Sequence, residues 1–161
     1  MPDLDATDIK ILRRLQRDGR ISNAELADRV NLSQSACLRR VRRLEDAGVI
    51  SGYVALLDPS SIGQACDVFV EITLNSQSEE SLEAFEEAVR ACPEVMECYL
   101  MSGDADYLLR LVASGTGDYE RIHKTRLSRF PGVSRIRSSF ALRVVSKKTE
   151  YDLDTLEGTK A

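Results

Sequence analysis

The sequence predicts an α+β protein with two domains. Apolar residues recur at the three- and four-residue spacing of helices before residue 58, and they alternate with polar residues after residue 66, as strands of a half-buried sheet do. A turn-rich stretch with Pro59 and Gly63 separates the two patterns. We therefore expect a helical domain at 1–58, a linker at 59–66, a βαββαβ domain at 67–146 and a C-terminal tail at 147–161.

The composition indicates a folded protein that does not enter a membrane. The chain of 161 residues is 43% hydrophobic and 30% charged, with a formal net charge of -4, which is typical of soluble globular proteins. No run of 18 apolar residues could cross a membrane, and the acidic start MPDLDATDIK lacks the basic and apolar regions of a secretory signal. We expect a cytoplasmic protein.

The cysteine and histidine patterns argue against a metal site and against an enzyme. The spacing of Cys37, Cys66, Cys92 and Cys98 fits neither a CxxC pair nor a zinc finger, so we interpret them as reduced thiols. The single histidine, His123, shares a helical face with apolar residues, which is more typical of a packed side chain than of a ligand. We expect no metal, no cofactor and no catalytic residue.

The first domain begins with two short helices. The first is expected to begin at Asp5 or Thr7 and to end at Gly19, since apolar residues between these positions follow helical spacing. Ser22 and Glu25 have the spacing of a capping box, in which each side chain bonds the backbone amide of the other residue. This box predicts the start of the second helix.

A third helix follows after a tight turn at Asn31. Ser33 can cap its start, and Gly48 is placed to end it. Beyond it, Val49–Ile50 and Tyr53–Leu57 are expected to form two short strands, a small wing. Three helices with a short turn between the last two form a helix-turn-helix, so we predict a winged helix-turn-helix domain.

The third helix has two different faces. Leu38, Val41 and Leu44 lie three residues apart and are expected to face the core, while the opposite side carries arginines. A helix in the major groove presents its N-terminal residues to base edges, and arginines farther along pair with guanine or phosphate. The candidate DNA-binding residues are Ser33, Gln34, Ser35, Ala36, Arg39, Arg40 and Arg43.

A run of charged residues on a helix often marks a solvent-exposed face that binds no DNA. The carboxylates available for pairing would be those of Glu25, Asp28, Glu45 and Asp46. For Arg40 and Arg42 taken singly, this alternative stays open. For the cluster as a whole, its place on the last helix of a helix-turn-helix favours binding to DNA.

The second half alternates strands and helices. The expected order is strand, helix, strand, strand, helix, strand, at about residues 68–74, 79–91, 95–101, 107–113, 119–130 and 133–145. This order predicts a ferredoxin-like sandwich in which both helices cover one face of an antiparallel sheet. The opposite face would expose apolar and aromatic side chains, and an uncovered apolar face of that size predicts at least a dimer.

The hairpin loop SGDADY is a candidate ligand site. Asp104 and Asp106, with free backbone groups of the loop, could hold the ammonium and carboxylate of an amino acid if the strands bring them near Ser138 and Ser139. Loops rich in Gly and Asp are also common for geometric reasons alone, so this alternative stays open. An enzyme is disfavoured because no nucleophile, metal set or cofactor loop accompanies the two aspartates.

The motifs GRIS, ELA, RVRRLE, GVISGY and SGDADYLL occur together in this chain and in this order. In this combination the chain resembles the Lrp/AsnC family of bacterial and archaeal transcription regulators over roughly residues 4–145. Through ALLDP and SGDADYLL it looks most like the leucine-responsive branch. The resemblance implies an N-terminal domain that binds double-stranded DNA and a C-terminal regulation-of-amino-acid-metabolism (RAM) domain that binds leucine or another amino acid.

The resemblance also implies an assembly and a set of effector-binding residues. Family members form dimers through their C-terminal sheets, and the dimers assemble into tetramers or octamers. The positions matching the effector-response region are Gly103, Asp104, Asp106, Tyr107, Ser138, Ser139 and Phe140. The tail SKKTEYDLDTLEGTKA is more acidic than we expect for the leucine-responsive branch. An alternative function is an architectural protein that coats or bends DNA with little regulation by a ligand.

Overall fold

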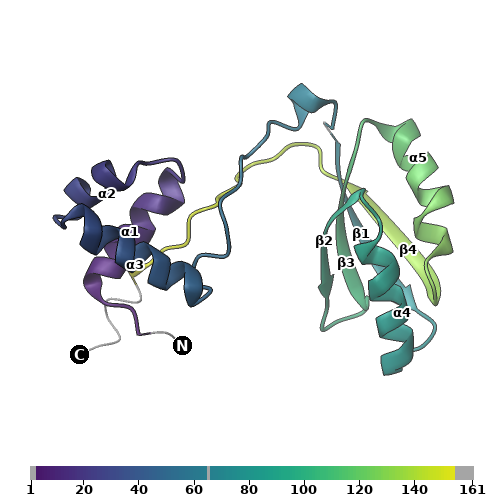
Figure 1. The fold of residues 1–161 in the computed structure, drawn as a ribbon. Helices are drawn as coiled ribbons and strands as arrows, with labels where there is room; N and C mark the ends of the chain where they lie inside the picture. Colours follow the sequence, from purple (N-terminus) through teal and green to yellow (C-terminus); the bar gives the residue numbers. More distant parts are fainter. Residues whose placement is uncertain (1–2, 65, 155–161) are drawn as a thin grey trace. The chain divides into compact units, whose positions relative to one another are not determined.

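Three helices form one unit of the chain, and a four-stranded sheet with two helices forms the other (Figure 1). The computed structural model describes residues 3–64 and 66–154. Within these residues, the first unit comprises 3–56 together with 146–154, and the second comprises the described residues of 57–145. The parts of the expected domains and tail at 1–2, 65 and 155–161 lie outside the described residues.

The first unit contains α1 (Ala6–Arg17), α2 (Asn23–Arg29) and α3 (Gln34–Asp46). Asp5 caps α1: its carboxylate accepts hydrogen bonds of 2.8 Å from the backbone amides of Thr7 and Asp8. The Asp8 carboxylate returns to the Asp5 amide at 3.1 Å, which completes a capping box. Of the two expected starts of this helix, the structure therefore has Asp5.

The box expected at the start of α2 is only half formed. The Ser22 hydroxyl accepts from the Glu25 amide at 3.2 Å. The Glu25 carboxylate pairs with Arg29 at 2.6 Å, one helical turn further on, and no bond joins it to the Ser22 amide among the described residues. An ion pair at this spacing is a favourable alternative for a glutamate in the first turn.

The predicted wing strands are absent. Residues 49–57 contain no strand in the structure. The backbone amides of Val49 and Ile50 instead donate to the carbonyl of Leu44, at 2.9 and 3.2 Å, and so satisfy the end of α3. The following side chains are exposed, including Val54 at 83% and Leu56 at 71%. Without a third strand or a helix to cover it, a two-stranded ribbon is marginal in water.

The three helices pack around a small apolar core. Its fully or nearly buried members come from α1, α2, the α2–α3 turn and α3: Ile11, Leu12, Leu26, Ala27, Val30, Cys37 and Leu44. This core fixes which side of α3 points inward.

The second unit is an antiparallel sheet in the order β2-β3-β1-β4. Its elements are β1 (Cys66–Leu74), α4 (Glu79–Arg90), β2 (Val95–Leu100), β3 (Tyr107–Ala113), α5 (Thr116–Thr125) and β4 (Val133–Phe140), with 3-10 turns at Ser60–Ile62 and Leu127–Arg129. The βαββαβ order and the α+β fold class expected from the sequence are confirmed.

Both helices cover the same face of the sheet. Phe85 of α4 and Ile122 of α5 join one buried cluster with alternate residues of the central strands, among them Val70 of β1 and Leu109 of β3. The alternation predicted from the sequence for β1 therefore marks the covered face.

The last strand is shorter than expected. We predicted it as far as Val145, but β4 ends at Phe140, where its partner β1 also approaches its own start. The amide of Ala141 makes the final bond, 3.0 Å to the carbonyl of Asp67. Beyond it residues 3–64 and 66–154 offer no further strand to pair with, and Leu142 is 99% exposed. Burial within one chain therefore does not explain the apolar residues at 142–145.

Candidate nucleic-acid interface and ligand region

The start of α3 is anchored by polar contacts. The Ser33 hydroxyl accepts from the amide of Ala36 at 3.3 Å, which caps the helix as predicted. The side-chain amide of Asn23, on α2, donates to the carbonyl of Gln34 at 2.9 Å. These bonds fix α3 against α2 and leave the side chains of Gln34 and Ser35 exposed at the helix N-terminus.

The exposed face of α3 differs in one position from the expectation. Cys37 and Leu44 are buried and Val41 is half-buried, as predicted. Leu38, however, is 39% exposed rather than directed into the core. Arg40 lies at the other edge of the buried face, and its side chain is only 28% exposed.

Arg40 and Arg43 are held by carboxylates at the start of α1. The Asp8 side chain is fully buried, and its two oxygens pair with Arg40 at 2.8 Å and with Arg43. Asp5 also pairs with Arg40, at 2.6 Å. The guanidinium groups of Arg40 and Arg43 therefore face α1, and only that of Arg43 stays about half exposed.

These pairs change the electrostatics of both partners. Hydrogen bonds to Asp5 and Asp8 raise the pKa of Arg40 above its ordinary value. Burial alone would raise the pKa of Asp5, but hydrogen bonds from the Asp8 amide and from Arg40 lower it below its ordinary value. The network thus holds carboxylate and guanidinium groups in contact between α1 and α3.

Arg39 and Arg42 are the two outward arginines of the cluster. Both are exposed, and neither has an ion pair or hydrogen bond within residues 3–64 and 66–154. With Gln34, Ser35 and Leu38 they form the solvent-facing side of α3. Arg42 was not among the DNA-binding residues predicted from the sequence.

Asp106, in the candidate ligand loop, has a structural position. It is only 7% exposed, and its carboxylate accepts from the Leu74 amide at 2.7 Å and from the Gln77 side chain at 2.6 Å. These bonds fix the end of β1 against the hairpin. Gly103 and Asp104, by contrast, are exposed.

Tyr107 is also part of the interior. It is 1% exposed, its ring lies 4.5 Å from that of Phe85, and its hydroxyl donates to Glu86 at 3.0 Å. Burial first, and then the bond to Glu86, raise the pKa of the Tyr107 hydroxyl well above its ordinary value. This side chain packs α4 onto the sheet.

The structure does not bring Ser138 and Ser139 to the hairpin loop. They lie on β4 opposite Val70 and Phe69 of β1. The hairpin loop ends where β3 begins, at Tyr107, which lies opposite Ile72 of β1. Because β1 separates β3 from β4, the two groups lie on different strands and at different heights of the sheet. One chain alone does not assemble the candidate effector residues into a single site.

Two of the β4 residues pack against α5. The hydroxyl of Ser138 bonds that of Tyr119, and the ring of Phe140 meets the ring of Tyr119 edge-on at 5.1 Å. Ser139 points to the opposite face and is exposed. Among residues 3–64 and 66–154, no group of three or more His, Cys, Asp or Glu side chains could hold a metal ion.

Comparison with known proteins identifies both units. Residues 67–151 match the family model described as the Lrp/AsnC ligand binding domain. The chain belongs to the Lrp/AsnC family. Residues 4–51 match a second model, described as a winged helix-turn-helix DNA-binding domain. The family predicted from the sequence motifs is confirmed.

Relatives over most of the chain are transcription regulators. The leucine-responsive regulatory protein of Escherichia coli is 44% identical over 95% of this chain and 93% of its own length. The Bkd operon transcriptional regulator of Pseudomonas aeruginosa is 46% identical over 90% and 95%. A transcriptional regulator of Neisseria meningitidis, solved as a complex with L-methionine, is 38% identical, covers 96% of this chain and 99% of its own, and superposes with a TM-score of 0.91.

The protein is therefore a transcription regulator of the Lrp/AsnC family with a DNA-binding and a ligand-binding domain, and not an enzyme. In the described part of the chain, no helix has the length and apolar character needed to span a membrane. Sequence reasoning missed Asp8 as a partner of α3. Locally, the sequence shows only that Asp8 follows Asp5 by three residues, a spacing that a helix cap explains without any contact to α3.

Proposed function

We propose that this Lrp/AsnC protein regulates genes of amino-acid metabolism, binds its operators through the exposed face of α3, and responds to an amino acid. The observation that carries this proposal is the outward pair Arg39 and Arg42, beside Gln34 and Ser35 at the exposed start of the same helix. A groove-binding helix needs short polar side chains at its start and cations further along. Because such a regulator acts on the chromosome, we place it in the cytoplasm.

The residues of α3 and its cap divide into two roles in this proposal. Gln34, Ser35, Arg39 and Arg42 contact bases and phosphates, because their side chains are exposed. Ser33, which caps α3, and the half-buried Ala36 shape the helix start that approaches the DNA. Arg40 and Arg43 act as positioning residues, since their guanidinium groups already bind Asp8. Phosphate contacts fix the register on the duplex, and base contacts supply the sequence preference.

We place the effector near the exposed hairpin residues Gly103 and Asp104, together with Ser139 and Phe140. Within one chain β1 separates the hairpin of β2 and β3 from β4, so the proposal requires a second copy to bring the two groups together. Asp106, Tyr107 and Ser138 support the site from the interior. An amino acid fits a loop that offers a carboxylate and unpaired backbone amides, and the Neisseria relative was solved with L-methionine.

A dimer forms, in this proposal, through the sheet face that the helices leave uncovered. Phe69 is 39% exposed and Tyr99 52% exposed on that face, and Leu108 is half-buried between them. Arg110 lies among them with ion pairs to Asp67 at 2.9 Å and Glu97 at 3.0 Å, so its charge is compensated. Apolar side chains around a neutralised centre suit contact with a second copy. Dimers then assemble into tetramers or octamers.

Genomic binding with and without amino acids tests this function. Purified protein is incubated with fragmented chromosomal DNA, and the bound fragments are sequenced with no amino acid and with leucine, methionine and the others in turn. We expect discrete sites near genes of amino-acid metabolism, and a change in occupancy or oligomer size with at least one amino acid, because a ligand shifts only states that it binds unequally. Uniform coating of DNA, unchanged by every amino acid, would contradict the proposal and favour an architectural protein.

A further inference from the structure

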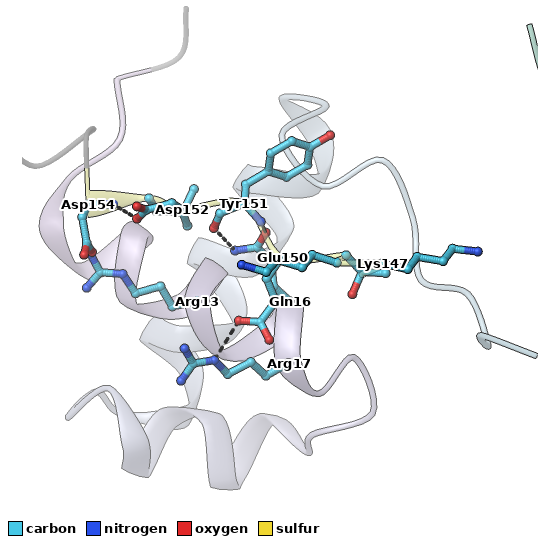
Figure 2. A pocket seen from close by; sticks show the side chains of 11 residues that line it. Arg13, Gln16, Arg17, Lys147, Glu150, Tyr151, Asp152 and Asp154 are labelled. Atoms are coloured by element: carbon cyan, nitrogen blue, oxygen red, sulfur yellow. Dashed lines mark hydrogen bonds and ion pairs between the residues drawn. The ribbon is translucent and has the colours of Figure 1, made fainter. Parts of the chain in front are cut away.

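The C-terminal segment 147–154 lies along α1 of the DNA-binding unit (Figure 2). Together they line a groove of about 620 Å³. Three side chains of α1 face the segment: Arg13, Gln16 and Arg17. They lie on one side of the helix, at the three- and four-residue spacing that brings helical side chains together.

Gln16 binds the backbone of the segment in both directions. Its side-chain oxygen accepts from the amide of Tyr151 at 2.7 Å, and its side-chain nitrogen donates to the carbonyl of the same residue at 3.3 Å. This pair of bonds requires an extended chain, because both backbone groups of one residue must point to one partner. The contact therefore selects a conformation and does not depend on charge alone.

Ion pairs flank this contact on both sides. Arg17 pairs with Glu150 at 2.9 Å, and Arg13 pairs with Asp154. Leu153, between them, packs against the apolar core of the unit. Exposed ion pairs alone contribute little to docking, so the Gln16 bonds and the burial of Leu153 hold the segment in place.

We propose that the segment 147–154 docks on α1 of its own chain. Its carboxylates then pair with Arg13 and Arg17 and so compete with DNA phosphates for these two arginines. Each of these arginines is a cation on the DNA-binding unit, and free cations add affinity for any DNA sequence. With Glu150 and Asp154 in place their charges are neutralised, and the unpaired outward cations of α3 remain those of Arg39 and Arg42. Docking thus favours specific over non-specific binding.

A matched pair of variants tests the electrostatic role. Glu150→Gln removes a charge that pairs with Arg17, whereas Asp152→Asn removes an equal charge from a side chain that accepts a hydrogen bond from the Asp154 amide. Binding to a duplex without operator sequence is measured by fluorescence anisotropy over a range of salt concentrations. We expect Glu150→Gln to bind about two- to fivefold more tightly at low salt, with a salt slope steeper by about 0.9 for each DNA-bound subunit. Asp152→Asn should differ little from the parent chain, and equal effects of the two variants would overturn the proposal.

Hydrogen exchange tests whether the segment docks on α1 and whether it does so within its own chain. The Tyr151 amide should exchange slowly in the full chain and at least about fivefold faster in Arg17→Glu or Glu150→Arg, because each replaces attraction by repulsion. Both changes in one chain should restore protection. Mixing the two single variants should not restore it, since docking occurs within one chain. Fast exchange in the parent chain, or restored protection in the mixture, would overturn docking within the chain.

Discussion

The buried carboxylate of Asp8, on α1, accepts a 2.8 Å hydrogen bond from the guanidinium of Arg40, on α3. Its second oxygen pairs with Arg43, so one side chain holds two of the four clustered arginines. Removing Asp8 leaves Arg43 and the Asp5 amide without this acceptor, while Arg40 keeps only its pair with Asp5. We expect Asp8→Ala to lower the free energy of unfolding of the DNA-binding unit by about 3 kcal/mol, measured by exchange of its core amides.

The control for this variant is Asp28→Ala. Asp28 is exposed on α2, and its side chain has no partner within the described ranges 3–64 and 66–154. Its replacement should change the stability by less than about 0.5 kcal/mol. If Asp8→Ala were equally mild, the Asp8 network would not be what fixes α3.

Replacing Asp106 should lower the stability of the fold, whereas replacing Asp104 should weaken amino-acid binding. Asp106→Ala leaves the buried amide of Leu74 without its acceptor, and an unsatisfied buried donor costs about 1–3 kcal/mol. Asp104 is exposed, so Asp104→Ala should leave stability unchanged while weakening amino-acid binding. Thermal unfolding and titration calorimetry with amino acids measure the two effects. A stable Asp106→Ala variant that has lost only ligand binding would show that Asp106 contacts the ligand directly.

The turn at Asp58 should loosen in acid. Hydrogen bonds from the hydroxyl groups of Ser60 and Ser61 lower the pKa of the Asp58 carboxyl to about 2. A carboxyl with a lowered pKa stabilises the fold above its ordinary pKa near 3.8, and this contribution is lost as the pH falls toward 2. Carbon-detected NMR titration of Asp58 should give the low value, and Ser60→Ala with Ser61→Ala should raise it. A midpoint near 4 in the parent chain would contradict the observed bonds.

Cys98 should react slowly with alkylating reagents. Burial, followed by the nearby charge of Glu86, raises the pKa of its thiol to about 11. Because the thiolate is the reactive form, alkylation of Cys98 at pH 8 should be about a hundredfold slower than that of an exposed cysteine. Mass spectrometry after iodoacetamide treatment measures this, with chain unfolded in guanidinium as the control. Equal rates in the folded and unfolded chain would contradict the placement of Cys98.

Local chemistry made much of the fold predictable. The capping residues Ser22 and Ser33 and the alternation along β1 depend on neighbours in sequence, and each lies where predicted. The wing and the end of β4 depend on whether a partner strand exists, which no local pattern reports. Residues 53–57 and 142–145 have the apolar pattern of strands, but the structure assigns them no strand and their large apolar side chains are exposed.

The site was less predictable, because its key contacts are long-range. Arg40 is partly buried because Asp8, more than thirty residues earlier, provides a buried partner for its guanidinium, while Leu38 at the other edge of the inward face is 39% exposed. Asp106 looked like a ligand residue because its type and loop fit that role, yet its carboxylate binds the end of β1. The contact of Gln16 with Tyr151 joins residues near opposite ends of the chain, and no spacing in the sequence announces it.

The salt dependence of operator binding tests the central claim most directly. The double variant Arg39→Ala with Arg42→Ala is compared with Arg129→Ala, which removes an exposed arginine from the ligand-binding unit. If both α3 arginines contact phosphate, the double variant should make the negative slope of log K against log salt less steep by about 1.8 for each DNA-bound subunit and weaken binding, while Arg129→Ala changes neither. An unchanged slope and affinity in the double variant would contradict the assignment of this face of α3 to DNA.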